Sequence, residues 1–129
     1  METIKDILKE SGYSDKAIEF YIGRVNVGEI TKPSIHHACT GPGGDTIEIY
    51  LIIKSDIILE AKFQAIGCAG IFSSGSALTC MIIGKTIEQA KMMHVEDIVN
   101  FLGDVPDKKI ECAVLAKKTL EESIFHYLQ

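Results

Sequence analysis

The chain has 129 residues, of which 47% are hydrophobic, so it is long enough for one domain with a sizeable core. Its formal net charge of −5 argues against nucleic acid as the main partner, because phosphate binding requires a basic surface. No apolar stretch is long enough to cross a membrane, and the N-terminus lacks the apolar segment of a signal peptide. We therefore expect a cytoplasmic protein with reduced cysteines, which are more often metal-binding, catalytic or buried than paired.

Two short helices are predicted at the N-terminal end. Apolar residues at helical spacing indicate an amphipathic helix over residues 3–10. Ser14 is a typical N-cap for a second helix over residues 15–23. We expect a single domain over residues 1–129, in which residues 1–12 form a short helical extension.

A three-stranded antiparallel sheet is predicted in the middle of the chain. A short strand near residues 34–39 is followed by a glycine-rich turn and a strand over residues 45–53. Alternation places one apolar set on the inner face of this second strand: Ile47, Ile49, Leu51 and Ile53. A tight turn leads to a third strand over residues 57–66, with a second apolar set expected to point inward: Leu59, Ala61, Phe63 and Ala65.

Helical patterns fill the rest of the chain. They predict helices over residues 69–83, 87–93, 96–102 and 111–128. Thr86 and Gln89 form a capping box for the second of these. Helices packed on a small antiparallel sheet give an α+β sandwich.

Two cysteines lie where a helix is expected to begin. Cys68 and Cys112 occupy these positions, and the partial positive charge of a helix N-terminus favours thiolate over thiol. Asp45 follows the turn Gly41-Pro42-Gly43-Gly44. Two thiolates and a carboxylate from three separate junctions outline a metal or cluster site. The alternatives are buried cysteines and a carboxylate that only caps a turn.

The remaining cysteines and histidines are weaker candidates. Cys80 lies about 18 Å along a helix from Cys68, so core packing is expected for it. His36 and His37 lie near Cys39 and are either metal ligands or a neutral exposed pair.

Several motifs in order along the chain resemble those of the IscU/NifU-type iron–sulfur cluster assembly scaffolds, over about residues 13–128. The stretch from Tyr13 to Tyr21 resembles the family's opening helix. The remaining motifs are Asn26-Val27-Gly28, Gly44-Asp45, Ile66-Gly67-Cys68 with Ser73-Ser74, Gly84-Lys85-Thr86, and Lys109-Ile110-Glu111-Cys112 with Leu115-Ala116.

The resemblance implies a function and a ligand set. Such scaffolds receive sulfur from a cysteine desulfurase, assemble a transient [2Fe–2S] cluster from iron and sulfur, and pass it to recipient apoproteins. By the match, the ligands are Cys68, Cys112 and Asp45. We expect Cys68 to accept the persulfide, because its glycine-rich flanks give access, with Cys112 as the alternative. Zinc could occupy the site in the isolated protein. Three basic residues could help to dock the desulfurase: Lys62, Lys108 and Lys109.

Two family positions differ in this chain. The first cysteine of the family's Cys-Gly-Asp motif falls on Gly43, and the histidine before its last cysteine falls on Glu111. Because iron–sulfur clusters prefer four ligands, we hypothesise that Cys39 supplies the missing thiolate. The alternative is that Cys39 has no role. Glu111 is either a hard metal ligand or a first-turn acid that stabilises its helix.

The expected function is thus a scaffold or carrier and not an enzyme. One alternative is a degenerate family member that binds zinc or a desulfurase without building a cluster, for which Gly43 and Glu111 are the basis. A second alternative is covalent sulfur transfer without iron.

Overall fold

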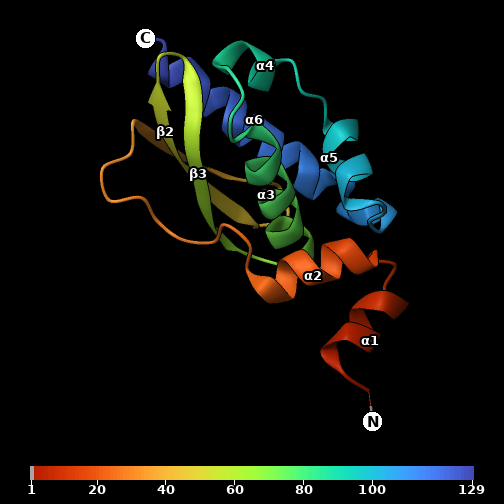
Figure 1. Cartoon of the computed structure of the whole chain (residues 1–129). Helices are drawn as coiled ribbons and strands as arrows, with labels where there is room; N and C mark the ends of the chain where they lie inside the picture. The colour runs from red at the N-terminus through yellow and green to blue at the C-terminus, as the bar shows by residue number, and fades with distance from the viewer. Residues whose placement is uncertain (1) are drawn as a thin grey trace.

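The computed structural model describes residues 2–129 and has the predicted α+β architecture, a three-stranded antiparallel sheet with helices packed on it (Figure 1). The strands follow one another in the sheet in the order β1-β2-β3. The elements in chain order are α1 (Ile4–Glu10), α2 (Asp15–Gly23), β1 (Ile35–Thr40), β2 (Thr46–Lys54), β3 (Ile57–Ile66), α3 (Ala69–Ile82), α4 (Ile87–Lys91), α5 (Val95–Leu102), the 3₁₀ turn η1 (Asp107–Lys109) and α6 (Ile110–Tyr127).

The inner face of the central strand is the one that alternation predicts. Ile47, Ile49 and Leu51 of β2 are fully buried. The prediction for β3 is correct at Ala61 and Phe63 but wrong at Leu59, which is 48% exposed. A register shift between Ile52 and Ile53 interrupts the pairing of β2 with β3, and beyond it the neighbour Ile58 is buried in place of Leu59. An irregularity of this kind changes which side chains face the core.

Helices α3 and α6 cover the buried face of the sheet and lie against each other (Figure 1). Helix α3 approaches β3 closely because its central residues are small. A Cβ on Gly75 would lie 2.6 Å from the ring of Phe63, which is fully buried. Hydroxyl groups in α3 are satisfied by backbone oxygens, as when Thr79 donates to the carbonyl of Gly75. The small residues therefore let the apolar core form against a large aromatic side chain.

The N-terminal segments lie at the edge of this core. Helix α2 packs on α3 and buries Ala17 and Ile18. Helix α1 forms over almost the predicted residues and projects at the end of the chain marked N in Figure 1, with Ile4 and Ile7 exposed. Within residues 2–129, no helix combines the length and the apolar character that crossing a bilayer requires.

Candidate metal centre

Three side chains with metal-binding atoms meet at one end of the sheet. Asp45 directly precedes β2, Cys68 directly precedes α3, and Cys112 lies in the first turn of α6. The Sγ atom of Cys68 lies 3.3 Å from Oδ2 of Asp45 and 3.8 Å from Sγ of Cys112. The Sγ atom of Cys112 lies 3.7 Å from the same carboxylate oxygen. The structure thus brings together the three residues that the sequence predicts as ligands.

The separations between these atoms match the edges of a tetrahedral metal site. Bonds of about 2.3 Å to sulfur and about 2.0 Å to oxygen place two sulfur ligands about 3.8 Å apart, and a sulfur and an oxygen about 3.5 Å apart. The observed sulfur–sulfur distance is 3.8 Å, and the two sulfur–oxygen distances are 3.3 and 3.7 Å. Three ligands in this arrangement leave a fourth position for a water, an exogenous ligand or a bridging sulfide.

Cys68 is the more acidic of the two thiols. It is the N-cap residue of α3 and makes no side-chain capping bond. A hydrogen bond with Cys112 lowers the pKa of Cys68 to about 6, and the backbone N–H groups of Ile71 and Gly70 act in the same direction. Burial and the carboxylate of Asp45 oppose this lowering. Cys68 is therefore a thiolate at neutral pH, the form that binds metal and attacks sulfur.

Cys112 keeps its proton in the absence of metal. Its side chain is buried, and its hydrogen bond with Cys68 is the main cause that raises the pKa of Cys112, followed by burial. The sequence predicts a thiolate at each helix start. The two sulfur atoms lie 3.8 Å apart beside a carboxylate, so repulsion between two negative sulfur atoms favours one proton on the pair. A metal ion would displace the second proton.

Two further side chains face the sulfur atoms. The charge of the Cys68 thiolate is the main cause that raises the pKa of Lys109. Lys109 precedes Cys112 by three residues. Because residues at this spacing lie on the same face of a helix, the sequence contains a signal that Lys109 lies near the site. Tyr13 is buried beside the cysteines, and burial, then the charges of Cys68 and Cys112, raise its pKa to about 12. Because Tyr13 lies far from these residues in the chain, no local sequence pattern indicates that it lies beside the cysteines.

Two glycines control the space around the site. Gly67 has a φ of +150°, and a Cβ on it would lie 2.6 Å from the carboxyl group of Asp45. A side chain at this position would push Asp45 away from Cys68. By contrast, a Cβ on Gly43 would meet no atom within 4 Å. The position where the resemblance places a cysteine is thus open and able to accept a side chain.

The structure does not bring Cys39 to this group. Cys39 is opposite Ile47 in the pairing of β1 with β2, and its thiol lies 3.5 Å from Oε2 of Glu122 in α6. Glu122 follows Cys112 by ten residues, which corresponds to about 15 Å along the helix. Cys39 is therefore directed toward a different part of α6, and the hypothesis that it supplies the missing thiolate beside Asp45 is wrong in this structure.

The other candidate residues lie outside the group. Cys80 is half-buried in α3, where the side chain of Asn26 donates to its sulfur atom, as core packing predicts. Glu111 is exposed in the first turn of α6, the position of an acid that stabilises a helix start. Lys108 is also exposed, and Lys62 lies beside Gly28 on the outer side of β3. Desulfurase docking by these lysines stays a prediction.

Because the pKa of Cys68 is lowered, its rate of alkylation should change with pH at lower pH than for an ordinary cysteine. Because its pKa is lowered to about 6, the rate with iodoacetamide should rise with pH through about 6 and level off above neutrality. Cys80 is an internal control, since burial raises its pKa and its rate should still rise well above pH 8. Peptide mass spectrometry after timed labelling measures both rates. Equal midpoints for the two cysteines would contradict the assignment.

Comparison with known proteins gives the family of the chain. The family model described as the NifU-like N-terminal domain matches residues 12–129. Nitrogen fixation protein NifU of Nostoc sp. is 33% identical over 124 residues, which is 89% of this chain and 41% of that protein. The chain thus spans about two fifths of the length of this relative. Iron–sulfur cluster assembly scaffold protein IscU 1 of Archaeoglobus fulgidus is 34% identical over 118 residues, which is 91% of this chain and 77% of that protein.

Solved structures agree with this assignment. FiSufU from Fervidobacterium islandicum AW-1, described as a candidate iron–sulfur cluster assembly scaffold for the SUF system, has a TM-score of 0.76 and 26% identity. The match covers 87% of this chain and 96% of that one. A NifU-like N-terminal protein from Brucella abortus has a TM-score of 0.71 at 15% identity, covers 98% of both chains, and supports the fold alone. The predicted resemblance is confirmed, and the chain belongs to the NifU-like N-terminal domain family.

Proposed function

We propose that this protein is an iron–sulfur cluster assembly scaffold that holds a transient [2Fe–2S] cluster and transfers it to recipient apoproteins. The observation that carries the proposal is the convergence of Asp45, Cys68 and Cys112, whose ligand atoms all lie within 4.8 Å of one another. Relatives with the same domain are named as iron–sulfur cluster assembly scaffolds. We propose a carrier and not a catalyst of small-molecule turnover.

Sulfur would be delivered by a cysteine desulfurase as a persulfide. The thiolate of Cys68 would attack the terminal sulfur of the donor persulfide, form a new S–S bond and release the donor's cysteine as a thiolate. Cys68 is suited to this step because it is the ionised member of the pair and only half-buried, whereas Cys112 is protonated and buried. The ammonium group of Lys109 would balance the thiolate charge before iron arrives.

A mixed ligand set would suit temporary binding. A carboxylate holds iron less strongly than a thiolate does, so Asp45 would favour release of the cluster. The four cysteines among residues 2–129 are free, and the proposed chemistry requires reduced thiols. The cytoplasm, where thiols stay reduced, is the compartment that we propose.

Anaerobic reconstitution with iron, cysteine and a desulfurase tests the proposed function. We expect a reddish protein with stoichiometric iron and sulfide and the absorption of a [2Fe–2S] cluster. Tight zinc binding with no coloured product would contradict the proposal. It would favour the alternative of a degenerate family member that binds zinc or a desulfurase without building a cluster. A persulfide on Cys68 without bound iron would favour sulfur transfer alone.

The Gly43→Cys variant should hold a cluster longer than the natural sequence. The new side chain would enter open space next to Asp45 and supply a further thiolate to a set that has two. We expect the lifetime of the reconstituted cluster with a chelator to increase by about tenfold or more, since clusters prefer thiolate ligands. Decay of the visible absorption measures it. Gly43→Ser is the matched control, and an equal gain in that variant would contradict the ligand explanation.

A further inference from the structure

A second set of metal-binding side chains lies between β1 and α6. His37 and Cys39 are two residues apart on β1, so they share one face of the strand. Glu122 and His126 are four residues apart on α6, so they lie one turn apart on one side of the helix. Because β1 packs on α6, the two pairs face a common interface.

The contacts across this interface are already close without a metal. Nε2 of His37 lies 3.1 Å from Oε1 of Glu122, and Sγ of Cys39 lies 3.5 Å from Oε2 of the same carboxylate. The ligand atoms of these three residues all lie within 4.8 Å of one another. The ring of His126 packs on that of His37, with centroids 4.8 Å apart. Glu122 thus joins both β1 side chains to the helix.

The chemistry and spacing of this set fit zinc. Imidazole, thiolate and carboxylate are the ligands of Zn²⁺, and tetrahedral bonds place nitrogen and oxygen about 3.4 Å apart, and sulfur and oxygen about 3.5 Å apart. The observed distances are 3.1 and 3.5 Å. A thiolate from Cys39 and the carboxylate of Glu122 would together neutralise the charge of the ion. Lys118, one turn before Glu122, is the nearby cation that would compete for the carboxylate.

We propose that His37, Cys39 and Glu122 bind a zinc ion, with His126 as the fourth ligand after rotation of its exposed side chain. Binding would displace the thiol proton of Cys39 to solvent and replace the present hydrogen bonds with bonds to the metal. The ion would link the edge strand β1 to the C-terminal helix and stabilise the folded state by mass action. Without an ion, the contact between His37 and Glu122 would be only a partly exposed ion pair of small effect.

The test uses the full chain with the first site removed. In a Cys68→Ser, Cys112→Ser background, we expect one equivalent of Co²⁺ to bind and to give a sulfur-to-cobalt charge-transfer band, which excess Zn²⁺ removes. Adding Cys39→Ser should abolish the band. Adding His37→Ala, Glu122→Gln or His126→Ala should each weaken Zn²⁺ binding about tenfold or more by competition titration. Zn²⁺ should raise the melting temperature of the background variant but not that of the Cys39→Ser form.

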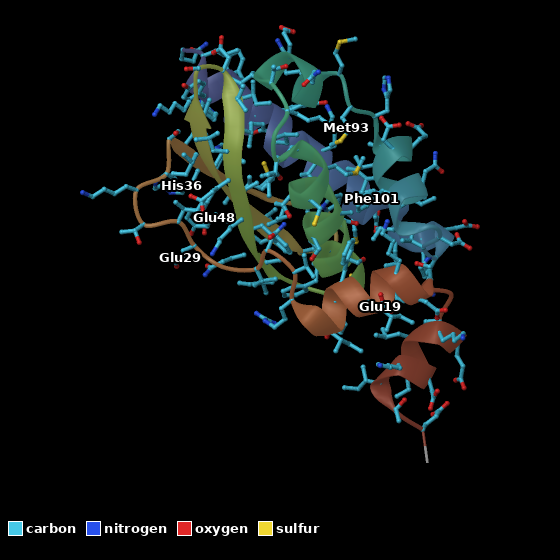
Figure 2. The ribbon with its side chains drawn as sticks, in the orientation of Figure 1. Glu19, Glu29, His36, Glu48, Met93 and Phe101 are labelled. Carbon is cyan, nitrogen blue, oxygen red and sulfur yellow. The ribbon has the colours of Figure 1, made fainter. Side chains whose placement is uncertain are left out.

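His36→Ala is the matched control. His36 is the neighbour of His37 on β1, so strand alternation directs its side chain to the opposite face. There its ring stacks on that of Tyr50, and its Nε2 atom lies 3.7 Å from Oε2 of Glu48. Figure 2 labels both His36 and Glu48. Removal of the His36 side chain should leave metal affinity unchanged.

Three results would overturn the inference. They are no Co²⁺ binding in the background variant, a band that survives Cys39→Ser, and a loss in His36→Ala equal to that in His37→Ala. Unchanged affinity in His126→Ala would overturn the fourth ligand. Each variant is also melted without metal. A curve that matches that of the Cys68→Ser, Cys112→Ser background shows that the variant is folded, so its loss of metal binding is not caused by unfolding. The set shares no residue with Asp45, Cys68 and Cys112, so the result does not depend on the proposed function.

Discussion

The Cys68→Ala variant is expected to retain no more than about a tenth of the iron and sulfide that the natural sequence holds after anaerobic reconstitution. Removing Cys68 takes away the only thiolate of the metal-free pair and two of the three close contacts in the site, at 3.3 and 3.8 Å. Cys112 and Asp45 alone cannot surround an iron ion. Iron and acid-labile sulfide per chain, with the visible spectrum, measure the loss.

Cys80→Ala is the control for this experiment. Cys80 lies in the same helix, α3, and is half-buried like Cys68. Its sulfur atom accepts a hydrogen bond from Asn26, and among residues 2–129 it belongs to no group of three potential metal ligands. This variant should hold the cluster as the natural sequence does. Circular dichroism and a thermal melt of Cys68→Ala without metal show that its fold is intact. A Cys68→Ala protein with full iron and sulfide would refute the ligand assignment.

The largest effect on stability is expected at Ile58 of β3, and a much smaller one at its neighbour Leu59. Ile58 is fully buried and Leu59 is 48% exposed, although simple alternation from Ala61 and Phe63 points Leu59 inward. Ile58→Ala should lower the free energy of unfolding by about 2 to 5 kcal/mol, because it removes a buried side chain and leaves a cavity. Leu59→Ala should cost about 1 kcal/mol or less, because much of that side chain is already in contact with water.

Urea unfolding of the two variants and the natural sequence, followed by circular dichroism, measures this difference. The two substitutions change similar volumes in adjacent positions, so each is the control for the other. Equal losses in the two variants, or a larger loss in Leu59→Ala, would contradict the register shift between Ile52 and Ile53. Unchanged slopes against urea concentration would show that both variants unfold from the same compact state.

Much of the fold is readable from local signals. Thr86 and Gln89 form the predicted capping box, and Ser14 caps α2 through the backbone N–H of Ala17. Such caps depend on residues three apart, so a sequence pattern contains all the information. The alternation in β2 is equally local, and Ile47 is buried as it predicts. The register shift opposite β3 depends on pairing between strands, which no single segment determines.

The candidate metal centre shows the same division. The chain alone indicates Cys68 and Cys112 as helix-start thiols and Asp45 as a turn carboxylate, because each role follows from neighbouring residues. Which thiol is ionised depends on contacts between α3 and α6. The position of Tyr13 beside the cysteines, and its raised pKa, depend on how the N-terminal segment packs against α3 and α6.

The sequence by itself therefore determined most of the helices and strands, the family resemblance and the three residues of the candidate metal centre. Their order and local periodicity contain that information. Only the tertiary structure decided that Cys39 lies with His37 and Glu122 and not with Asp45. Strand alternation decides which face of β1 carries Cys39, and helix rise decides which residues of α6 lie one turn apart. Which turn of α6 faces Cys39 depends on how the strand and the helix pack, and these two segments are distant in the sequence.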